Sequence, residues 1–190
     1  MNVKEMVGKN RSYRRFDGSK RISEKQLKEM IDCARQTSSG ANFQPLRYHL
    51  TGTEDECAAV YSTLKWAAYL PKWDGPVESE RPTAYIIVLS DNEVNDVMAK
   101  TDAGIAMQTI LLSAVEKGLG GCIFASINRD KLREVIGLDE RYEIMFVIAL
   151  GAPVEEVVIE DVKEDGSIKY YRDDQNVHHV PKRRLEDLII

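Results

Sequence analysis

The spacing of hydrophobic and polar residues predicts helices and strands that are interleaved along the chain, without internal repeats. The clearest helix signal begins at Ser23, which forms a capping box with Gln26 ahead of apolar residues at helical spacing. Asn128 and Gly137 give a second helix a cap and a stop. We expect helices over residues 3–9, 23–37, 56–70, 102–117 and 128–138, and extended segments over 46–53, 83–90, 122–127 and 142–151.

Two of these segments indicate how the core is built. Residues 142–151 are continuously apolar, as in a central strand that is buried on both faces. The helix over 102–117 is apolar around much of its circumference, so it belongs in the core or in a subunit interface. The fold class is therefore α+β, with one sheet and helices packed around it.

The last segment, about residues 152–190, is charged and lacks the periodicity of a core element. Such a tail stays disordered or wraps around something. Its tyrosines, valines and closing apolar triplet favour wrapping. Its acidic run over 155–161 is most simply a solvated edge. We expect residues 1–190 to form a single domain, of which this tail is the extended C-terminal part.

Composition excludes several classes of protein. The chain has 190 residues and a net charge of −5, which argues against a nucleic-acid surface. The longest apolar run, residues 145–150, is too short to cross a membrane, and no signal peptide opens the chain, so a cytoplasmic location is expected. Cys33, Cys57 and Cys122 are widely spaced, which predicts buried, reduced thiols and no metal site.

Positive charge is concentrated near both ends of this acidic chain. Arg11, Ser12 and Arg14 lie within "NRSYRRF", and Lys182 and Arg184 lie within "PKRR". Guanidinium, hydroxyl and ammonium donors together suit a phosphate. The spacing alone leaves two alternatives open: the two clusters converge on a phosphate-sized anion, or they face solvent.

Several motifs, in order, resemble those of the nitroreductase family of FMN-dependent NAD(P)H oxidoreductases. These are "RSYRRF", "SSGANFQPLRYHL", "DAGIAMQTILLSAVEKGLGGCIF", "IALGAP" and "PKRRL", and the resemblance spans about residues 5–190. It implies a central, mostly antiparallel sheet flanked by helices, with a C-terminal tail that extends over the partner subunit. It also implies a homodimer with FMN at the subunit interface.

The resemblance further implies the roles of particular residues. FMN would be bound by Arg11, Ser12, Arg14, Ser38, Ser39, Asn42, Gln44, Gly121, Ala125, Ser126, Lys182 and Arg184. Ser38, Ser39 and Asn42 would reach the flavin from the partner subunit. NAD(P)H would be a transient electron donor, and small planar nitroaromatic, quinone or flavin-type acceptors would be reduced by a ping-pong mechanism. No catalytic side chain is expected, because the flavin carries the chemistry.

The sequence departs from the family pattern at three places. Asn10 stands where many members have a basic residue, and Leu46 follows Gln-Pro in place of the usual Trp. Ala125-Ser126 differs from the pairs found in some branches, which leaves the hydrogen bonding near flavin N5 open. Two other functions are compatible with the motifs: a different flavin reaction, such as dehalogenation or metabolite oxidation, or non-enzymatic anion binding.

Histidines and aromatic residues offer further candidates for chemistry. Adjacent His178 and His179 point to opposite faces of an extended segment, which favours tail packing or interface contacts over catalysis or metal binding. Trp66, Tyr69 and Trp73 either pack in the ordinary way or form an aromatic wall above the flavin.

Overall fold

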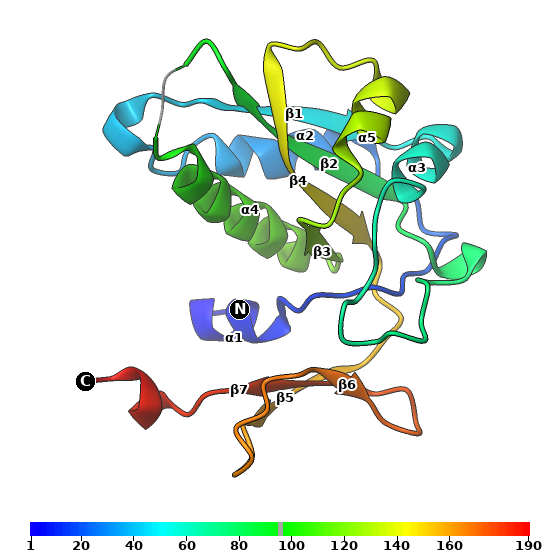
Figure 1. The fold of residues 1–190 in the computed structure, drawn as a ribbon, viewed down its shortest axis with the longest axis vertical. Coiled ribbons are helices and arrows are strands. Elements are labelled where there is room, and N and C mark those ends of the chain that lie inside the picture. The colour runs from blue at the N-terminus through cyan, green and yellow to red at the C-terminus, as the bar shows by residue number, and fades with distance from the viewer. Residues whose placement is uncertain (95–96) are drawn as a thin grey trace.

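The computed structural model describes residues 1–94 and 97–190 (Figure 1). The helices are α1 (Val3–Lys9), α2 (Glu24–Ala34), α3 (Glu54–Tyr61), α4 (Ala99–Glu116) and α5 (Arg129–Ile136), with 3-10 helices η1 (Gly40–Asn42), η2 (Glu78–Glu80) and η3 (Leu185–Leu188). The strands are β1 (Leu46–Thr51), β2 (Ala84–Asp91), β3 (Gly120–Phe124), β4 (Tyr142–Gly151), β5 (Val157–Asp161), β6 (Tyr171–Arg172) and β7 (His178–Lys182).

The main sheet is antiparallel throughout and has the strand order β1-β2-β4-β3. Alternate residues of β2 point to opposite faces. Ile86 belongs to a core cluster with residues of α2 and α4, whereas Ile87 belongs to a second cluster with residues of α3 and α5. The sheet is therefore the middle layer between two helical layers (Figure 1). Fully buried side chains such as Ile110 and Leu132 each stabilise this packing by about 1.5–3 kcal/mol.

Local signals in the sequence set several element ends. The predicted capping box forms at α2, where the Gln26 N–H donates to Ser23 Oγ at 3.3 Å. Asn128 caps α5 as predicted, and the Lys131 N–H donates to its side-chain oxygen at 3.2 Å. Gly137 ends α5 at a φ of 59°, a left-handed conformation that glycine adopts without strain. These signals act within one helical turn, which is why the sequence predicts them well.

The helix predicted over residues 56–70 is wrong beyond Tyr61. The hydroxyls of Ser62 and Thr63 donate to the carbonyls of Ala59 and Val60, at 2.8 and 2.7 Å, and such side-chain bonds compete with helix propagation. Leu64 then forms an isolated bridge with Ile127. Tertiary contacts therefore hold residues 62–70 in an irregular loop.

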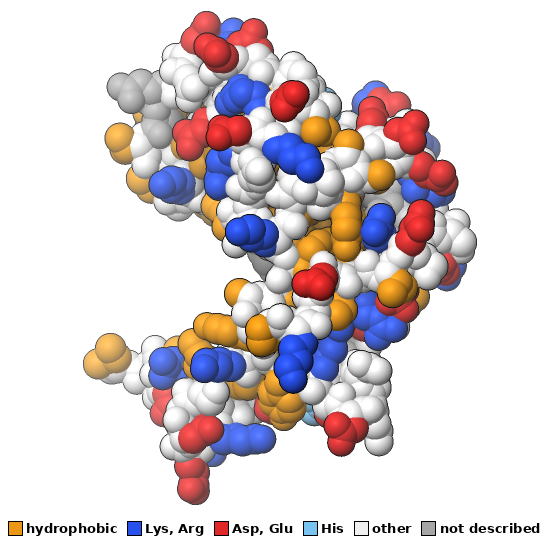
Figure 2. Space-filling model, turned by 45° about the vertical axis from the view of Figure 1, so that its right-hand side comes forward, with side chains coloured by type: hydrophobic (Ala, Val, Ile, Leu, Met, Phe, Trp, Pro, Cys, Tyr) orange, Lys and Arg blue, Asp and Glu red, His pale blue; other side chains and the backbone are white. Residues whose placement is uncertain are grey.

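The tail, residues 152–190, contains a sheet of its own that the sequence did not predict. β7 pairs with β5 in parallel and with β6 in antiparallel. In Figure 1 this sheet lies apart from the main one, with α1 between it and α4. Figure 2 shows a hollow between the tail and the main body. Leu185 is 71% exposed and Ile189 is 70% exposed, so the end of the tail has no apolar cover within the described chain.

The predicted burial of the cysteines is correct for two of the three. Cys57 and Cys122 are buried, whereas Cys33 is exposed on α2. Across residues 1–94 and 97–190, no helix combines the length and hydropathy that a membrane span requires.

Candidate functional site

The basic segment at residues 10–16 lies against the edge strand β3. Ser12 forms a parallel bridge with Gly121, and the Tyr13 N–H donates to the Gly121 carbonyl at 3.0 Å. A Cβ at Gly121 would collide with the Ala149 carbonyl, and one at Gly120 would collide with the Tyr13 ring. Gly120 therefore allows the basic segment to approach the sheet closely, whereas Gly121 allows β3 to pack closely against β4 and α4.

The arginines of this segment are held in different ways. The Arg11 guanidinium donates to the Val7 carbonyl at 2.6 Å, and burial lowers its pKa. Its Nε is buried and has no hydrogen-bond partner in the part of the chain that the structure describes, so a donor remains for a bound acceptor. Arg14 is 8% exposed and lies 4.8 Å from the ring centroid of Tyr170 in the tail. This cation–π contact fixes Arg14 at the junction of body and tail.

Glu155 organises the backbone of the basic segment, a role that the sequence did not predict. Its buried carboxylate accepts the N–H of Arg14 and, at 3.2 Å, that of Arg15. It also forms an ion pair with Arg172 of β6, at a distance of 2.8 Å. The prediction that the acidic run is a solvated edge is therefore wrong at Glu155. No sequence signal marks this residue, because its partners lie up to 141 positions away.

A second group of predicted residues lies at the other end of α4. Ser39 Oγ donates to Asp102 at 2.5 Å, and the Gly40 N–H donates to the same carboxylate at 3.1 Å. Asp102 is buried in the first turn of α4, whereas β3 follows the last turn. Ser39 and Gly40 are therefore held at the N-terminal end of α4, whereas Ser12 bridges Gly121 beyond its C-terminal end.

The loop after Ser39 is conformationally strained. Ala41, Asn42 and Gln44 have φ values of 45°, 58° and 51°, in a region that side chains other than glycine rarely adopt. The Gln44 N–H donates to Ser39 Oγ at 2.9 Å, so the Ser39–Asp102 pair holds the strained loop. The side chains of Asn42 and Gln44 are exposed. Strain of this kind is common where a loop is preorganised for a ligand.

The remaining predicted residues lie on β7 and after β3. Lys182 and Arg184 are exposed, and Arg184 is 3.9 Å from Asp161. Among the described contacts, none joins either residue to the first basic cluster. Alternation along β7 nevertheless puts Lys182 on the same face as His178. Ala125 and Ser126 are exposed at the end of β3, and the Ser126 carbonyl accepts the Lys65 N–H at 3.1 Å.

The aromatic residues of the 65–73 loop pack against the body and the tail. The Trp66 ring lies 4.7 Å from Phe124 and 6.0 Å from Trp73, and Tyr69 lies 4.9 Å from Tyr170. Arg172 lies 4.3 Å above the Trp73 ring. These contacts agree with the packing alternative and help to fasten the tail to the body.

His178 makes this junction sensitive to mild acid. Burial, together with Arg14, Arg172 and His179, lowers its pKa to about 4. Below about pH 6.5, His178 would take up a proton in the unfolded chain but not in the folded chain. The contribution of neutral His178 to the unfolding free energy is therefore fully present above that pH and is lost toward pH 4. We expect a loss of about 1–2 kcal/mol in unfolding free energy between pH 7 and pH 5.

Urea unfolding at a series of pH values tests this expectation. His178→Phe should reduce the loss of unfolding free energy between pH 7 and pH 5, because phenylalanine keeps a ring beside Tyr170 without a titratable group. His179→Asn is the matched control, since hydrogen bonds to Asp173 and Glu160 raise the pKa of His179 and give it the opposite pH dependence. If His178→Phe lost as much unfolding free energy in acid as the original chain, the assignment of this pH dependence to His178 would be contradicted.

An antiparallel sheet between helical layers, with a basic segment along its glycine-containing edge, defines an α+β protein. The model of the nitroreductase family matches residues 7–152. The chain therefore belongs to the nitroreductase family, and the resemblance drawn from the sequence is confirmed.

Individual relatives agree with this assignment at low identity. A protein of Archaeoglobus fulgidus, named as a candidate NADH dehydrogenase/NAD(P)H nitroreductase, is 23% identical over 159 residues, which cover 80% of this chain and 86% of the relative. A nitroreductase family protein from Clostridium novyi NT has a TM-score of 0.68 at 19% identity and covers 98% of both chains. A candidate nitroreductase from Exiguobacterium sibiricum, solved in complex with FMN, has a TM-score of 0.68 at 19% identity and covers 82% of this chain and 90% of its own.

These structures confirm the predicted α+β fold with a mostly antiparallel sheet. The extension of the tail over a second subunit stays a prediction.

Proposed function

We propose that the chain is an FMN-dependent oxidoreductase that takes electrons from NAD(P)H and passes them to nitroaromatic, quinone or flavin-type acceptors in a ping-pong sequence. The observation that carries the proposal is the basic segment Arg11–Ser12–Arg14, held along β3 by Gly121 within the region that matches the family. FMN, when bound, supplies the two-electron chemistry that no side chain provides.

The residues around this segment fit such a cofactor. Arg11 has a buried Nε without a partner, which an acceptor oxygen would satisfy. Guanidinium groups at Arg11 and Arg14 suit a phosphate or a polarised carbonyl. In the proposal, Lys182 and Arg184 close on the phosphate, and Gly121, Ala125 and Ser126 border the ring.

We also propose that the working form is a homodimer. Ser38, Ser39, Asn42 and Gln44 lie near the opposite end of α4 from the basic segment, so in this proposal they act on the cofactor of a second copy. Exposed hydrophobic side chains on α1 and the end of the tail support an interface; they are Val3, Val7, Leu185, Leu188 and Ile189. Figure 2 shows hydrophobic side chains along the part of the tail that faces the hollow. A second copy would cover them.

An absorption spectrum of the purified protein tests the proposed function directly. We expect flavin bands between about 300 and about 600 nm that bleach on anaerobic addition of NADPH or NADH. Reoxidation by a nitroaromatic or quinone acceptor would then establish the acceptor class. A colourless protein that also fails to take up added FMN would overturn the proposal and leave the basic clusters to another anion.

A further inference from the structure

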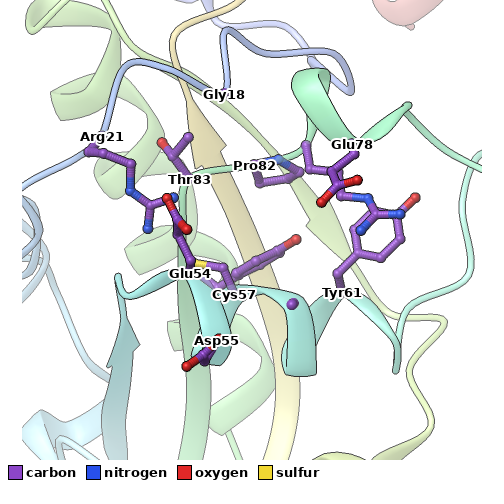
Figure 3. A pocket seen from close by; sticks show the side chains of 12 residues that line it. Gly18, Arg21, Glu54, Asp55, Cys57, Tyr61, Glu78, Pro82 and Thr83 are labelled. Carbon is purple, nitrogen blue, oxygen red and sulfur yellow. The ribbon is translucent and has the colours of Figure 1, made fainter.

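A pocket of about 350 Å³ lies away from the proposed flavin site, between α3 and the segments that precede α2 and β2 (Figure 3). Its walls contain none of the residues predicted to bind the cofactor. Gly18 closes one side, where its N–H donates to the Ser79 carbonyl at 2.9 Å. A pocket of this volume suits a small organic molecule.

The pocket is lined by buried polar groups that the protein leaves unsatisfied. Among residues 1–94 and 97–190, the hydroxyl of Tyr85 has no hydrogen-bond partner, although Tyr85 is fully buried in β2. Burial raises the pKa of Tyr85 well above its ordinary value, so the hydroxyl keeps its proton and remains a donor. The Nε of Arg81 is likewise buried without a partner. Unpaired buried donors are costly, and both would be satisfied by an acceptor in the pocket.

Charged side chains of both signs line the same pocket. Arg21 and Arg81 are both on its walls, and Arg81 lies 4.2 Å above the Tyr61 ring. In the described residues neither arginine forms an ion pair with a carboxylate. Figure 3 shows Arg21 extending toward Glu54 and Cys57, with Glu78 on the opposite side.

Three acidic residues line the pocket together with the two arginines. Glu54 and Asp55 begin α3, where a negative charge also suits the helix dipole, and Glu78 begins η2. Two positive and three negative side chains disfavour a polyanion, because the carboxylates would repel it. A purely apolar ligand would leave all five charges, as well as the Tyr85 hydroxyl, without new partners.

We propose that this pocket binds a small zwitterion of the amino-acid class. The carboxylate accepts from the Tyr85 hydroxyl and from Arg81, and the ammonium group faces the carboxylates of α3 and η2. Binding at this place is independent of the flavin chemistry, since no residue is shared between the two sites.

Isothermal titration calorimetry on the full chain tests the proposal without any need for bound flavin. The probes are ω-amino acids of two to six carbons, with the simple carboxylates and simple amines of the same lengths as comparisons. We expect at least one amino acid to bind, and the matched carboxylate and amine to bind about 10-fold more weakly or not at all. No binding by any amino acid, or equal binding by its matched carboxylate or amine, would overturn the proposal.

Tyr85→Phe is the decisive variant. It removes only an unpaired hydroxyl, so the fold should keep or gain stability, while affinity for the amino acid falls by about 10- to 100-fold. Arg81→Gln should cause a similar loss. Tyr142→Phe makes the same chemical change on β4, outside the pocket, and should bind as the original chain does. Unchanged affinity in Tyr85→Phe would show that the hydroxyl does not contact the ligand and would overturn the proposal.

Discussion

Arg14→Glu is expected to purify without flavin and to bind added FMN at least about 100-fold more weakly than the original chain. Arg14 is buried at the junction of the basic segment and the tail, stacked on Tyr170. A glutamate there would place a carboxylate where the proposed cofactor carries negative charge. Flavin absorbance at a known protein concentration, followed by fluorescence titration with FMN, measures the loss.

A second variant separates loss of binding from loss of fold. The new carboxylate of Arg14→Glu would also lie near Glu155, whose oxygen accepts the residue-14 N–H, so part of the effect could come from repulsion within the chain. Arg14→Met keeps an unbranched apolar side chain beside Tyr170 and adds no charge. We expect it to fold normally and to lose about 10- to 30-fold in affinity for FMN.

Lys9→Glu is the matched control for charge. It makes the same charge change at the exposed end of α1, a few residues before the basic segment. Its FMN affinity should change little, because exposed charges are screened by solvent and salt. Full flavin occupancy in Arg14→Glu would contradict the assignment of Arg14 to the cofactor site.

Glu155→Ala should lower the unfolding free energy by about 3–5 kcal/mol, because it breaks a buried ion pair and leaves Arg172 without its carboxylate. Two backbone N–H groups, those of Arg14 and Arg15, lose their acceptor at the same time. For a chain of this size the melting temperature should fall by roughly 6–15 °C. Thermal and urea unfolding measure the change, and limited proteolysis should show the tail cut first.

A double-mutant cycle identifies the source of that loss. If the orphaned guanidinium of Arg172 is the main cost, Glu155→Ala combined with Arg172→Met should be less destabilised than the sum of the single variants. Glu156→Ala is the neighbouring control, since Glu156 is exposed and only its backbone carbonyl accepts the His178 N–H. A melting temperature for Glu155→Ala equal to that of the original chain would contradict the role given to Glu155.

Local signals along the chain are enough to predict several elements, and the motifs are enough to identify the family. The Ser23 capping box and the Asn128 and Gly137 boundaries are set by hydrogen bonds within one turn. The apolar run over 142–151 is the central strand β4, as its continuous hydrophobicity predicts. The order of the motifs from "RSYRRF" to "IALGAP" identified the family that the comparison over residues 7–152 confirms.

Other features depend on contacts between distant segments, and these contacts exist only in the folded chain. Helix propensity continues past Tyr61, yet the bridge from Leu64 to Ile127 and the packing of Trp66 hold the following residues in a loop. In the sequence, Glu155 resembles the surface acids around it. In the folded chain it accepts a hydrogen bond from the Arg14 backbone, 141 positions away. The sequence gives the charge of a side chain, but its burial and its partners depend on the segments that pack against it.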